Sequence, residues 1–343
     1  MKLSKGIEVS MLAERNKFRR CLLAWYNRHR RGLPWRANRD PYRVWLSEIM
    51  LQQTRVAAVI GHYQEFLRRF PTIEKLAAAR EASVLAAWSG LGYYRRARML
   101  HAAAKVIVRE HKGKFPASEK QLRALPGIGR YTAAALASIA FDEPVAVVDG
   151  NVERVLQRLA GRQLAPEELW ETASHLLDKK RPGDFNQAMM ELGAVLCTPR
   201  APACLTCPIV DLCATRGELA VLAKPASQKK REVRYALHCR NGDDRGPEVF
   251  LVQRARNASL MAGMWELPER FGANGSTSPS FTLRHSITVT DYTVRVWSEA
   301  QQSHLNGKWI PVTRLTQIAL TGLARKILRK ANLLPQSATA MER

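Results

Sequence analysis

The sequence of 343 residues has no apolar run that approaches the roughly 18 residues of a membrane-spanning helix. Residues 1–10 lack the apolar core of a secretory signal, and no solenoid, collagen-like or prion-like repeat occurs. Acidic residues are scarce, since 30 Asp and Glu stand against 54 Lys and Arg, giving a formal net charge of +24. These features argue against a membrane or secreted protein. We expect a cytoplasmic protein that binds a polyanion, with nucleic acid favoured over an anionic membrane surface.

The patterning along the chain predicts a helical region followed by a smaller α+β region. With 46% hydrophobic and 24% charged residues, a chain of this length buries a substantial core and suggests two domains. We expect a helical region over 8–222, a linker over 223–231 and an α+β domain over 232–335, with strands at 248–253 and 292–297 and a final helix over 315–333. Helical periodicity is clear in residues 18–25, 44–51, 97–108, 136–139 and 152–159.

Cysteine is uncommon and unevenly placed. Four of the six cysteines fall within residues 197–213 with the spacing C-x6-C-x2-C-x5-C. Two disulfides are one reading, but the missing secretory signal and the distant Cys21 and Cys239 argue against it. Four thiolates suit either tetrahedral zinc or a [4Fe-4S] cluster, and the single C-x2-C knuckle favours iron–sulfur without excluding zinc. The candidate ligands are Cys197, Cys204, Cys207 and Cys213.

A glycine-containing segment, Leu125–Arg130, directly precedes an expected helix over 131–140. Gly127 and Gly129 allow positive φ angles and let backbone amides approach a ligand. The helix start adds unpaired N–H groups and the positive end of the helix dipole, which together suit a DNA phosphate. The alternative is a tight turn between two packed helices. The pattern is that of a helix-hairpin-helix.

Two acidic residues have surroundings that suggest chemistry. Asp149 or Asn151 is suited to cap the helix that begins there, and a carboxylate at this position can also face a developing cation. Glu48 lies in an apolar helix over 42–54, where desolvation would raise its pKa and make it a general acid. The alternatives are a purely structural cap and a glutamate that is solvated or paired on the helix exterior.

Six motifs occur in order and end in the four-cysteine loop. They are Leu33-Pro-Trp-Arg36, Ser47-Glu-Ile-Met-Leu-Gln-Gln-Thr54, Gly90-Leu-Gly-Tyr-Tyr94, Leu125-Pro-Gly-Ile-Gly-Arg130, Val148-Asp-Gly-Asn151 and Phe185-Asn-Gln-Ala-Met-Met-Glu-Leu-Gly193. Through these motifs, residues 15–215 resemble the adenine DNA glycosylases of the MutY type, within the helix-hairpin-helix glycosylase superfamily.

The resemblance implies a six-helix barrel beside a domain that holds a [4Fe-4S] cluster. It also implies a monomer that removes adenine mispaired with 8-oxoguanine or guanine in double-stranded DNA. Matched residue by residue, Glu48 would protonate the adenine ring, and Asp149 would stabilise the oxocarbenium ion electrostatically or through a covalent sugar adduct. Asn151 would support that site.

The remaining matched residues concern base flipping and strand cleavage. Gln52, Gln53 and Tyr93 match residues that enter the duplex while the adenine is flipped. Glycosylases that also cut the strand carry a Schiff-base lysine where this chain has Tyr131, so we predict a monofunctional enzyme. The adenine pocket would be formed by Trp35, Arg36, Tyr131 and Glu191.

The C-terminal part resembles the Nudix-like module with which this family reads 8-oxoguanine. Residues 263–268 fit that module, but only Glu269 follows closely, so magnesium-dependent nucleotide hydrolysis is not expected. Where the family commonly carries Phe-Ser-His, this chain has Ser-Ile-Thr-Val-Thr-Asp over 286–291. Ser286 and Thr288 are the candidate lesion contacts, and discrimination of 8-oxoguanine from guanine stays open.

Three alternative functions fit parts of the same pattern. A thymine–guanine mismatch glycosylase would share the barrel, the cluster and the tyrosine at the lysine position. A non-catalytic iron–sulfur DNA-binding protein would need neither Glu48 nor Asp149, and a zinc-stabilised DNA-binding module is the third. The family resemblance further suggests association with the nucleoid, an abasic-site endonuclease and a sliding clamp.

Overall fold

The computed structural model describes residues 14–219, 229–242, 246–258, 260–270, 278–287, 290–300 and 306–335. The chain divides into two compact units. The first comprises Met1–Thr54, Thr72–Ala77 and Ala102–Leu222, and the second comprises Arg55–Pro71, Ala78–His101 and Ala223–Arg343. Two helical segments therefore group with the C-terminal region. Among the described residues, no helix combines the length and apolarity that crossing a membrane requires.

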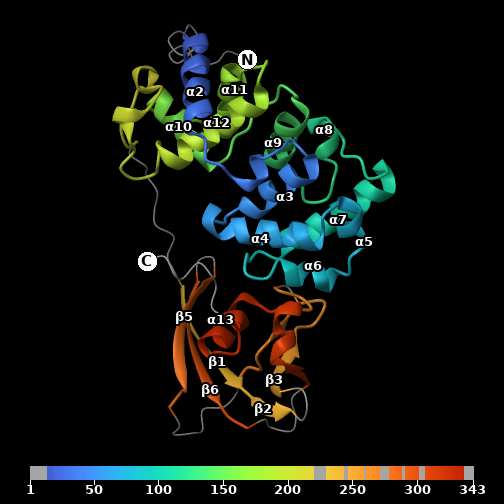
Figure 1. Cartoon of the computed structure of the whole chain (residues 1–343). Coiled ribbons are helices and arrows are strands. Elements are labelled where there is room, and N and C mark those ends of the chain that lie inside the picture. The colour runs from blue at the N-terminus through green and yellow to red at the C-terminus, as the bar shows by residue number, and fades with distance from the viewer. Residues whose placement is uncertain are drawn as a thin grey trace. The chain divides into compact units, whose positions relative to one another are not determined.

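The first unit is helical (Figure 1). Helices α2, α10, α11 and α12 lie together there and share one buried apolar cluster, which includes Phe18, Leu156 and Phe185. The helices expected from the periodicity at 18–25, 44–51, 136–139 and 152–159 are confirmed. The elements are α2 (Arg15–His29), η1 (Pro34–Arg36), α3 (Pro41–Leu51), α5 (Ile73–Ala78), α8 (Glu119–Leu122), α9 (Arg130–Phe141), α10 (Gly150–Ala160), α11 (Pro166–Leu176), α12 (Pro182–Val195), η2 (Cys204–Thr206) and η3 (Val210–Leu212).

Helices α8 and α9 flank the expected helix-hairpin-helix turn. Gly127 has a φ of 72°, in the left-handed region that favours glycine, as predicted. Gly129 differs from the prediction, because it is the N-cap of α9 with φ −84° and ψ 177°, which any residue can adopt. No atom lies within 4 Å of a Cβ built at Gly129. The missing side chain therefore leaves the N-terminus of α9 open.

The second unit combines helices with two small sheets. The expected strands at 248–253 and 292–297 are confirmed by β3 and β6, and the α+β class of the C-terminal region is confirmed with them. Its elements are α4 (Val56–Arg69), α6 (Glu81–Ala87), the first turns of α7 (Arg95–His111), β1 (Lys229–Leu237), β2 (Cys239–Gly242), β3 (Gly246–Gln253), β4 (Trp265–Glu266), β5 (Phe281–Ile287), β6 (Thr290–Ser298), β7 (Lys308–Pro311), η4 (Val312–Gln317) and α13 (Gly322–Lys330).

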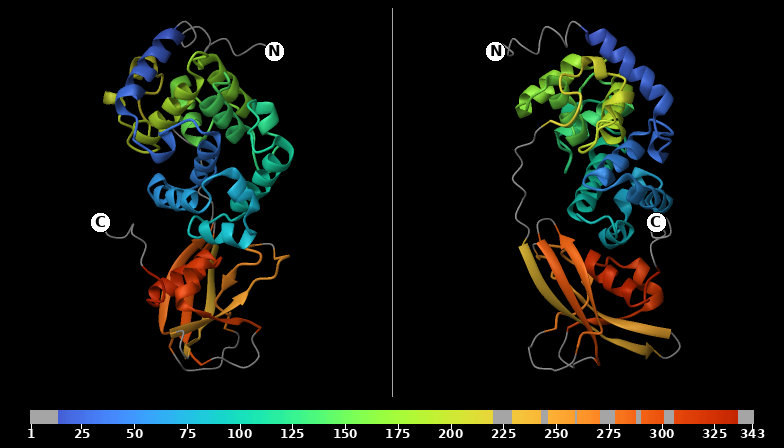
Figure 2. Two further views of the ribbon diagram at one scale, coloured as in Figure 1. Left: turned by 45° about the vertical axis from the view of Figure 1, so that its right-hand side comes forward. Right: turned by 90° about the vertical axis from the view of Figure 1, so that its left-hand side faces the viewer.

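The two sheets differ in topology. One has the order β1-β6-β5, with β1 parallel and β5 antiparallel to β6, so Val294 of β6 lies between Val233 and Leu283. The other has the order β2-β3-β4, with β7 also paired to β3. Helix α13 packs against the first sheet (Figure 2), and Leu323 and Ile327 share a buried cluster with Val294.

The expected helix over 315–333 is wrong at its start. A 3-10 helix ends at Gln317, and α13 begins only at Gly322 because the Thr321 side chain accepts the first cap hydrogen bond from the Ala324 amide. Between them the chain is extended and Leu320 bridges to Trp265. Strand β1 begins at Lys229, within the segment expected as a linker, whose residues 223–228 lie outside the described residues. The proposed boundaries 8–222 and 232–335 stay predictions.

Candidate active site

Glu48 is a buried carboxyl group on α3. The helix begins at Pro41 after Asp40, whose side chain accepts from the Arg43 amide, and it carries Glu48 into the interior with 6% of its surface exposed. The pKa of Glu48 is raised to about 7, mainly by burial: a hydrogen bond from Tyr131 and the charge of Arg36 oppose this rise, and nearby Asp149 adds to it. The expectation of a desolvated glutamate is confirmed. Near neutral pH a substantial fraction carries a proton.

Tyr131, in the first turn of α9, is the direct partner of Glu48. Its hydroxyl donates to Glu48 Oε2 at 2.5 Å and lies 3.6 Å from Met190 Sδ. Burial and the Glu48 carboxyl raise the pKa of Tyr131 well above its ordinary value, so the phenol keeps its proton. A neutral phenol orients the acid but cannot form an imine with a sugar.

Of the two residues predicted as candidate caps, Asp149 and Asn151, it is Asp149 that caps α10. Its Oδ1 accepts from the amides of Asn151 at 2.9 Å and Val152 at 2.7 Å, while Oδ2 accepts from Asn151 Nδ2 at 3.0 Å. These three donors fix the carboxylate at the start of the helix, where the helix dipole also stabilises negative charge. The effect of Asp149 on the pKa of Glu48 shows that the two carboxyl groups interact electrostatically.

Arg154 connects Asn151 to the cysteine loop. Its Nη2 donates to Asn151 Oδ1 at 2.9 Å and to the Gly193 carbonyl at 2.7 Å, while Nε donates to the Cys197 carbonyl at 2.8 Å. A Cβ at Gly193 would lie 2.7 Å from Asn151 Cβ, so this close approach of α10 and α12 requires glycine. Arg154 could not be identified from the sequence, because its partners lie up to 43 residues away.

Glu191 is the second buried carboxyl group of this unit, with 1% of its surface exposed. Arg31 donates to it through Nε and Nη2, both at 2.7 Å, and through its amide at 3.0 Å, and Arg36 Nη2 donates at 2.9 Å. Burial alone would raise the pKa of Glu191, but these hydrogen bonds and charges outweigh it and lower the pKa to about 2. Arg31 could not be identified from the sequence, although it lies only two residues before Leu33, the first residue of the Leu33–Arg36 motif.

Trp35 and Arg36 follow in the short helix η1, where Trp35 is 7% exposed. Both also line a polar cavity together with Arg30, Arg39 and other residues. Arg36 thus contacts Glu191 and shares this cavity with Trp35, and the assignment of these residues to one adenine pocket stays a prediction.

The residues expected to enter DNA fall in both units. Gln52 ends α3, and its Nε2 donates to Thr132 Oγ1 at 3.2 Å beside Tyr131. Gln53 has a φ of 55°, a left-handed conformation that non-glycine residues adopt rarely. Tyr93, in the second unit, has a φ of 45° and 47% of its surface exposed. An exposed aromatic ring on a constrained loop is typical of a binding surface.

The lesion-contact candidates are only partly described. Ser286 lies in β5, and its hydroxyl donates to Asp291 Oδ1 at 2.6 Å in the adjacent strand β6. Thr288 lies outside the described residues. Ser286 is exposed on the strand, so its hydroxyl is within reach of a ligand.

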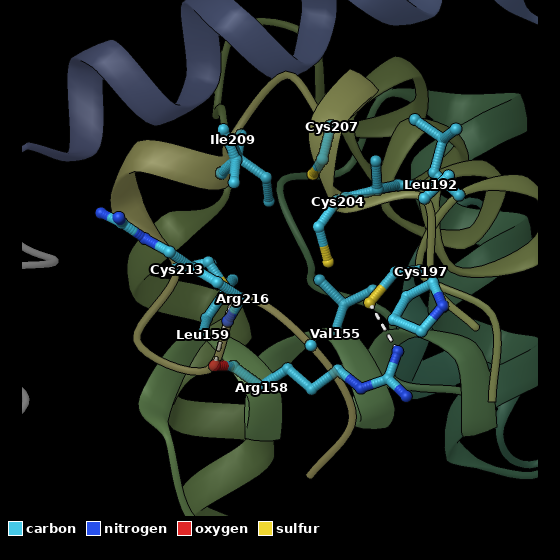
Figure 3. A pocket seen from close by; sticks show the side chains of 15 residues that line it. Val155, Arg158, Leu159, Leu192, Cys197, Cys204, Cys207, Ile209, Cys213 and Arg216 are labelled. Atoms are coloured by element: carbon cyan, nitrogen blue, oxygen red, sulfur yellow. Dashed lines mark hydrogen bonds between the residues drawn. The ribbon is translucent and has the colours of Figure 1, made fainter. Parts of the chain in front are cut away.

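All four clustered cysteines are free thiols and line one cavity (Figure 3). The walls are apolar, with Val155, Leu192 and Ile209 among the lining residues. Arg158 Nη1 donates to Cys197 Sγ at 3.3 Å. Among the described side chains, no three His, Cys, Asp or Glu converge closely enough to hold a single metal ion.

The chemistry of these thiols suits a group that carries positive charge and is larger than a single metal ion. The Arg216 amide donates to Cys213 Sγ at 3.4 Å, and burial raises the pKa of Cys207 to about 11. Deprotonating several thiols in an apolar cavity therefore requires positive charge among them, and Arg158 supplies only part of it. Four soft sulfur ligands around one cavity fit an iron–sulfur cluster, which also supplies that charge.

The turn between α8 and α9, with its open helix N-terminus, defines a helix-hairpin-helix protein, in which Glu48 and Asp149 are candidate catalytic carboxyl groups. Comparisons agree with this class. Residues 46–179 match the HhH-GPD superfamily of base excision DNA repair proteins. Adenine DNA glycosylase of Rattus norvegicus is 40% identical over 317 residues, which cover 76% of this chain and 61% of the rat protein. That of Schizosaccharomyces pombe is 32% identical over 320 residues, covering 74% and 69%.

A solved structure also matches. It is a thermostable thymine-DNA glycosylase, 31% identical, with a TM-score of 0.57 over 60% of this chain and 98% of that chain. The match to the rat protein leaves about two fifths of its length uncovered. The chain belongs to the HhH-GPD superfamily of base excision DNA repair proteins, and within it to the family of adenine DNA glycosylases.

Proposed function

We propose that this protein is a monofunctional DNA glycosylase that removes adenine mispaired with 8-oxoguanine or guanine in double-stranded DNA. The observation that carries the proposal is the pairing of Glu48, whose pKa is about 7, with the hydroxyl of Tyr131 close to Asp149. Glycosidic bond cleavage needs a proton donor for the leaving base and an anion near the developing cationic sugar. These two carboxyl groups meet both needs.

In this mechanism protonated Glu48 donates its proton to a ring nitrogen of adenine, and the glycosidic bond breaks as positive charge develops on the sugar. Asp149, held by three hydrogen bonds, stabilises that charge electrostatically or forms a covalent adduct with the sugar. Water completes hydrolysis, and the products are free adenine and an abasic site. Because Tyr131 offers no amine, the strand is not cut.

Base recognition follows from the residues around this centre. Trp35, Arg36 and Glu191 form the adenine pocket, in which Arg31 and Arg36 fix the Glu191 carboxylate before a base enters. A pocket ordered in advance costs less entropy on binding. Gln52, Gln53 and Tyr93 enter the duplex as the adenine is flipped, which replaces part of its lost stacking.

DNA binding is mainly electrostatic in this proposal. The open N-terminus of α9 after Gly127 and Gly129 binds a phosphate. The net charge of +24 favours the remaining backbone contacts and makes affinity fall steeply with salt. The product would then be passed to an abasic-site endonuclease.

The C-terminal region reads the base opposite adenine in this proposal, as a Nudix-like domain over 232–335. Ser286 is its described candidate contact, because its hydroxyl is exposed on β5. While the Ser286 hydroxyl donates to Asp291, its oxygen can still accept a hydrogen bond from the base opposite adenine.

We further propose that Cys197, Cys204, Cys207 and Cys213 hold a [4Fe-4S] cluster. When bound, such a group supplies positive charge and four metal–thiolate bonds that cross-link the loop over 197–213. The cysteine loop is connected to the active site through Arg154. Arg154 holds the Cys197 carbonyl and Asn151 together, so an ordered cysteine loop keeps Asp149 and its partner in place.

The second candidate function is a thymine–guanine mismatch glycosylase. The specific observation in its favour is the thermostable thymine-DNA glycosylase, 98% of whose chain is matched at 31% identity. That match covers 60% of this chain. The adenine reading is favoured because the adenine DNA glycosylase of Rattus norvegicus matches 76% of this chain at 40% identity.

A substrate panel tests the proposal. Single-turnover base release is measured on duplexes with adenine opposite 8-oxoguanine, guanine or cytosine, and with thymine opposite guanine, each quenched with and without hot alkali. We expect strand breaks at adenine opposite 8-oxoguanine and guanine only after alkali. Breaks without alkali would contradict a monofunctional enzyme, and activity on thymine–guanine alone would establish the second candidate.

A further inference from the structure

One backbone carbonyl in the C-terminal region accepts hydrogen bonds from two buried hydroxyl groups in the helical part of the same unit. The Leu320 carbonyl accepts from Ser89 Oγ at 3.2 Å and from Tyr94 Oη at 3.0 Å. Ser89 is 3% exposed, Tyr94 is 5% exposed and Leu320 is fully buried. Because a buried carbonyl without donors is costly, these hydrogen bonds fix the relative position of the two segments.

The C-terminal side of this contact is itself well anchored. The Thr321 amide donates to the Trp265 carbonyl at 2.9 Å, and the Trp265 amide donates to the Ala319 carbonyl at 2.8 Å. On α13, Arg325 Nε donates to Ser89 Oγ at 3.1 Å. We call residues 319–325 the anchor segment. It is tied to β4 on one side and to Ser89 on the other.

The helical side of the contact is the loop that carries Tyr93. Ser89 and Tyr94 are its two ends, so one carbonyl holds both. Inside the loop, Gly90, Gly92 and Tyr93 all have positive φ, at 112°, 67° and 45°. The Trp88 side chain donates to the Gly92 carbonyl at 3.2 Å. Glycine adopts positive φ freely, but at Tyr93 such a conformation persists only where the surroundings enforce it.

The position of Tyr93 follows from this clamp. Tyr93 is 47% exposed, and the Arg96 guanidinium lies 5.5 Å from the ring centres of both Tyr93 and Trp88. The ring is thus presented to solvent by a loop whose ends the anchor segment controls. We therefore expect a change at the anchor segment to alter the position of this ring.

We propose that the anchor segment, through Ser89 and Tyr94, is a positioning element that holds Tyr93 in the geometry needed to enter DNA. The C-terminal region then contributes to base flipping as well as to reading the opposite base. This inference rests on the proposed function, since it assigns Tyr93 to the duplex.

A double-mutant cycle tests the proposal. The variant Ser89→Ala/Tyr94→Phe deprives the Leu320 carbonyl of both hydroxyl donors while it keeps the aromatic ring. From two neutral hydrogen bonds, we expect single-turnover adenine release to fall by about tenfold or more. Added to Tyr93→Ala, the same two substitutions should cause little further loss, because they act through Tyr93. The matched control is Tyr235→Phe, which removes a hydroxyl from β1 of the same unit.

Two results would overturn the inference. One is an unchanged rate of adenine release in Ser89→Ala/Tyr94→Phe. The other is an equal loss of rate when these two substitutions are made in the unmodified protein and in Tyr93→Ala, which would indicate a general loss of stability. Hydrogen exchange of residues 89–94 gives a readout independent of catalysis: the double variant should exchange faster there, and unchanged exchange would refute the clamp. Absence of adenine release from the unmodified protein would instead refute the proposed function.

Discussion

Replacing Tyr131 with phenylalanine should move the pH dependence of adenine release toward alkaline pH. Glu48 donates a proton in the proposed mechanism, so the rate falls as pH rises through its pKa of about 7. The Tyr131 hydroxyl stabilises the ionised form of Glu48 through a 2.5 Å hydrogen bond and so lowers that pKa. In Tyr131→Phe this hydrogen bond is lost, so burial and Asp149 raise the pKa of Glu48 further.

The size of this effect follows from the strength of the hydrogen bond. A hydrogen bond to a charged group contributes about 1.5–3 kcal/mol, and about 1.4 kcal/mol corresponds to one pKa unit. The alkaline limb should therefore move by about one pH unit or more. Two pH units above the original limb, Tyr131→Phe would retain about ten times more of its plateau rate than the unmodified protein.

Single-turnover rates measured across pH on one adenine-containing duplex give this comparison, with each variant normalised to its own acid plateau. Tyr235→Phe, in the other unit, serves as the control and should leave the limb in place. A limb that stays fixed or moves to lower pH in Tyr131→Phe would refute Glu48 as the titrating acid.

Three further predictions concern stability and coupling. The pKa of Glu48 in the folded protein lies above its ordinary value of 4.5, so the free energy of unfolding decreases as pH rises from 4.5 through about 7. At pH 8, chemical denaturation should therefore show Glu48→Gln to be more stable than the unmodified protein, by at most about 3 kcal/mol. Equal stability of the two proteins would contradict the argument that burial raises this pKa. Asp149→Asn should keep the α10 cap to within about 0.5 kcal/mol but slow adenine release about a hundredfold or more, and a matching loss of stability would mean that Asp149 is only a cap. Arg154→Ala should slow adenine release about tenfold while the iron content per protein stays unchanged, because Arg154 contacts the Cys197 carbonyl and not its sulfur. Iron loss in proportion to the loss of activity would indicate that Arg154 stabilises only the cysteine loop.

Local features of the site could be predicted from the sequence because neighbours in the chain determine them. The cap by Asp149 depends on residues two and three positions later, and the burial of Glu48 on the apolar residues of its own helix. The helices with clear apolar periodicity could be predicted for the same reason. The four cysteines also line one cavity, as their spacing indicated.

Features that depend on distant contacts could not be predicted in this way. Arg31 meets Glu191 across 160 residues, and nothing in its own surroundings separates it from other surface arginines. Helix α13 begins later than the apolar pattern predicts, because Leu320 bridges to Trp265 instead of continuing a helix. The grouping of 55–71 and 78–101 with the C-terminal region likewise depends on packing between remote segments.

The most direct test of the central claim is adenine release by Glu48→Gln under single-turnover conditions, measured beside its affinity for an uncleaved adenine–8-oxoguanine duplex. Glutamine keeps the shape of the side chain but has no acidic proton to give. The account predicts that release falls to background while affinity stays within about threefold of the unmodified protein, since phosphate contacts dominate binding. Release at an undiminished rate by a variant that binds normally would show that Glu48 is not the proton donor.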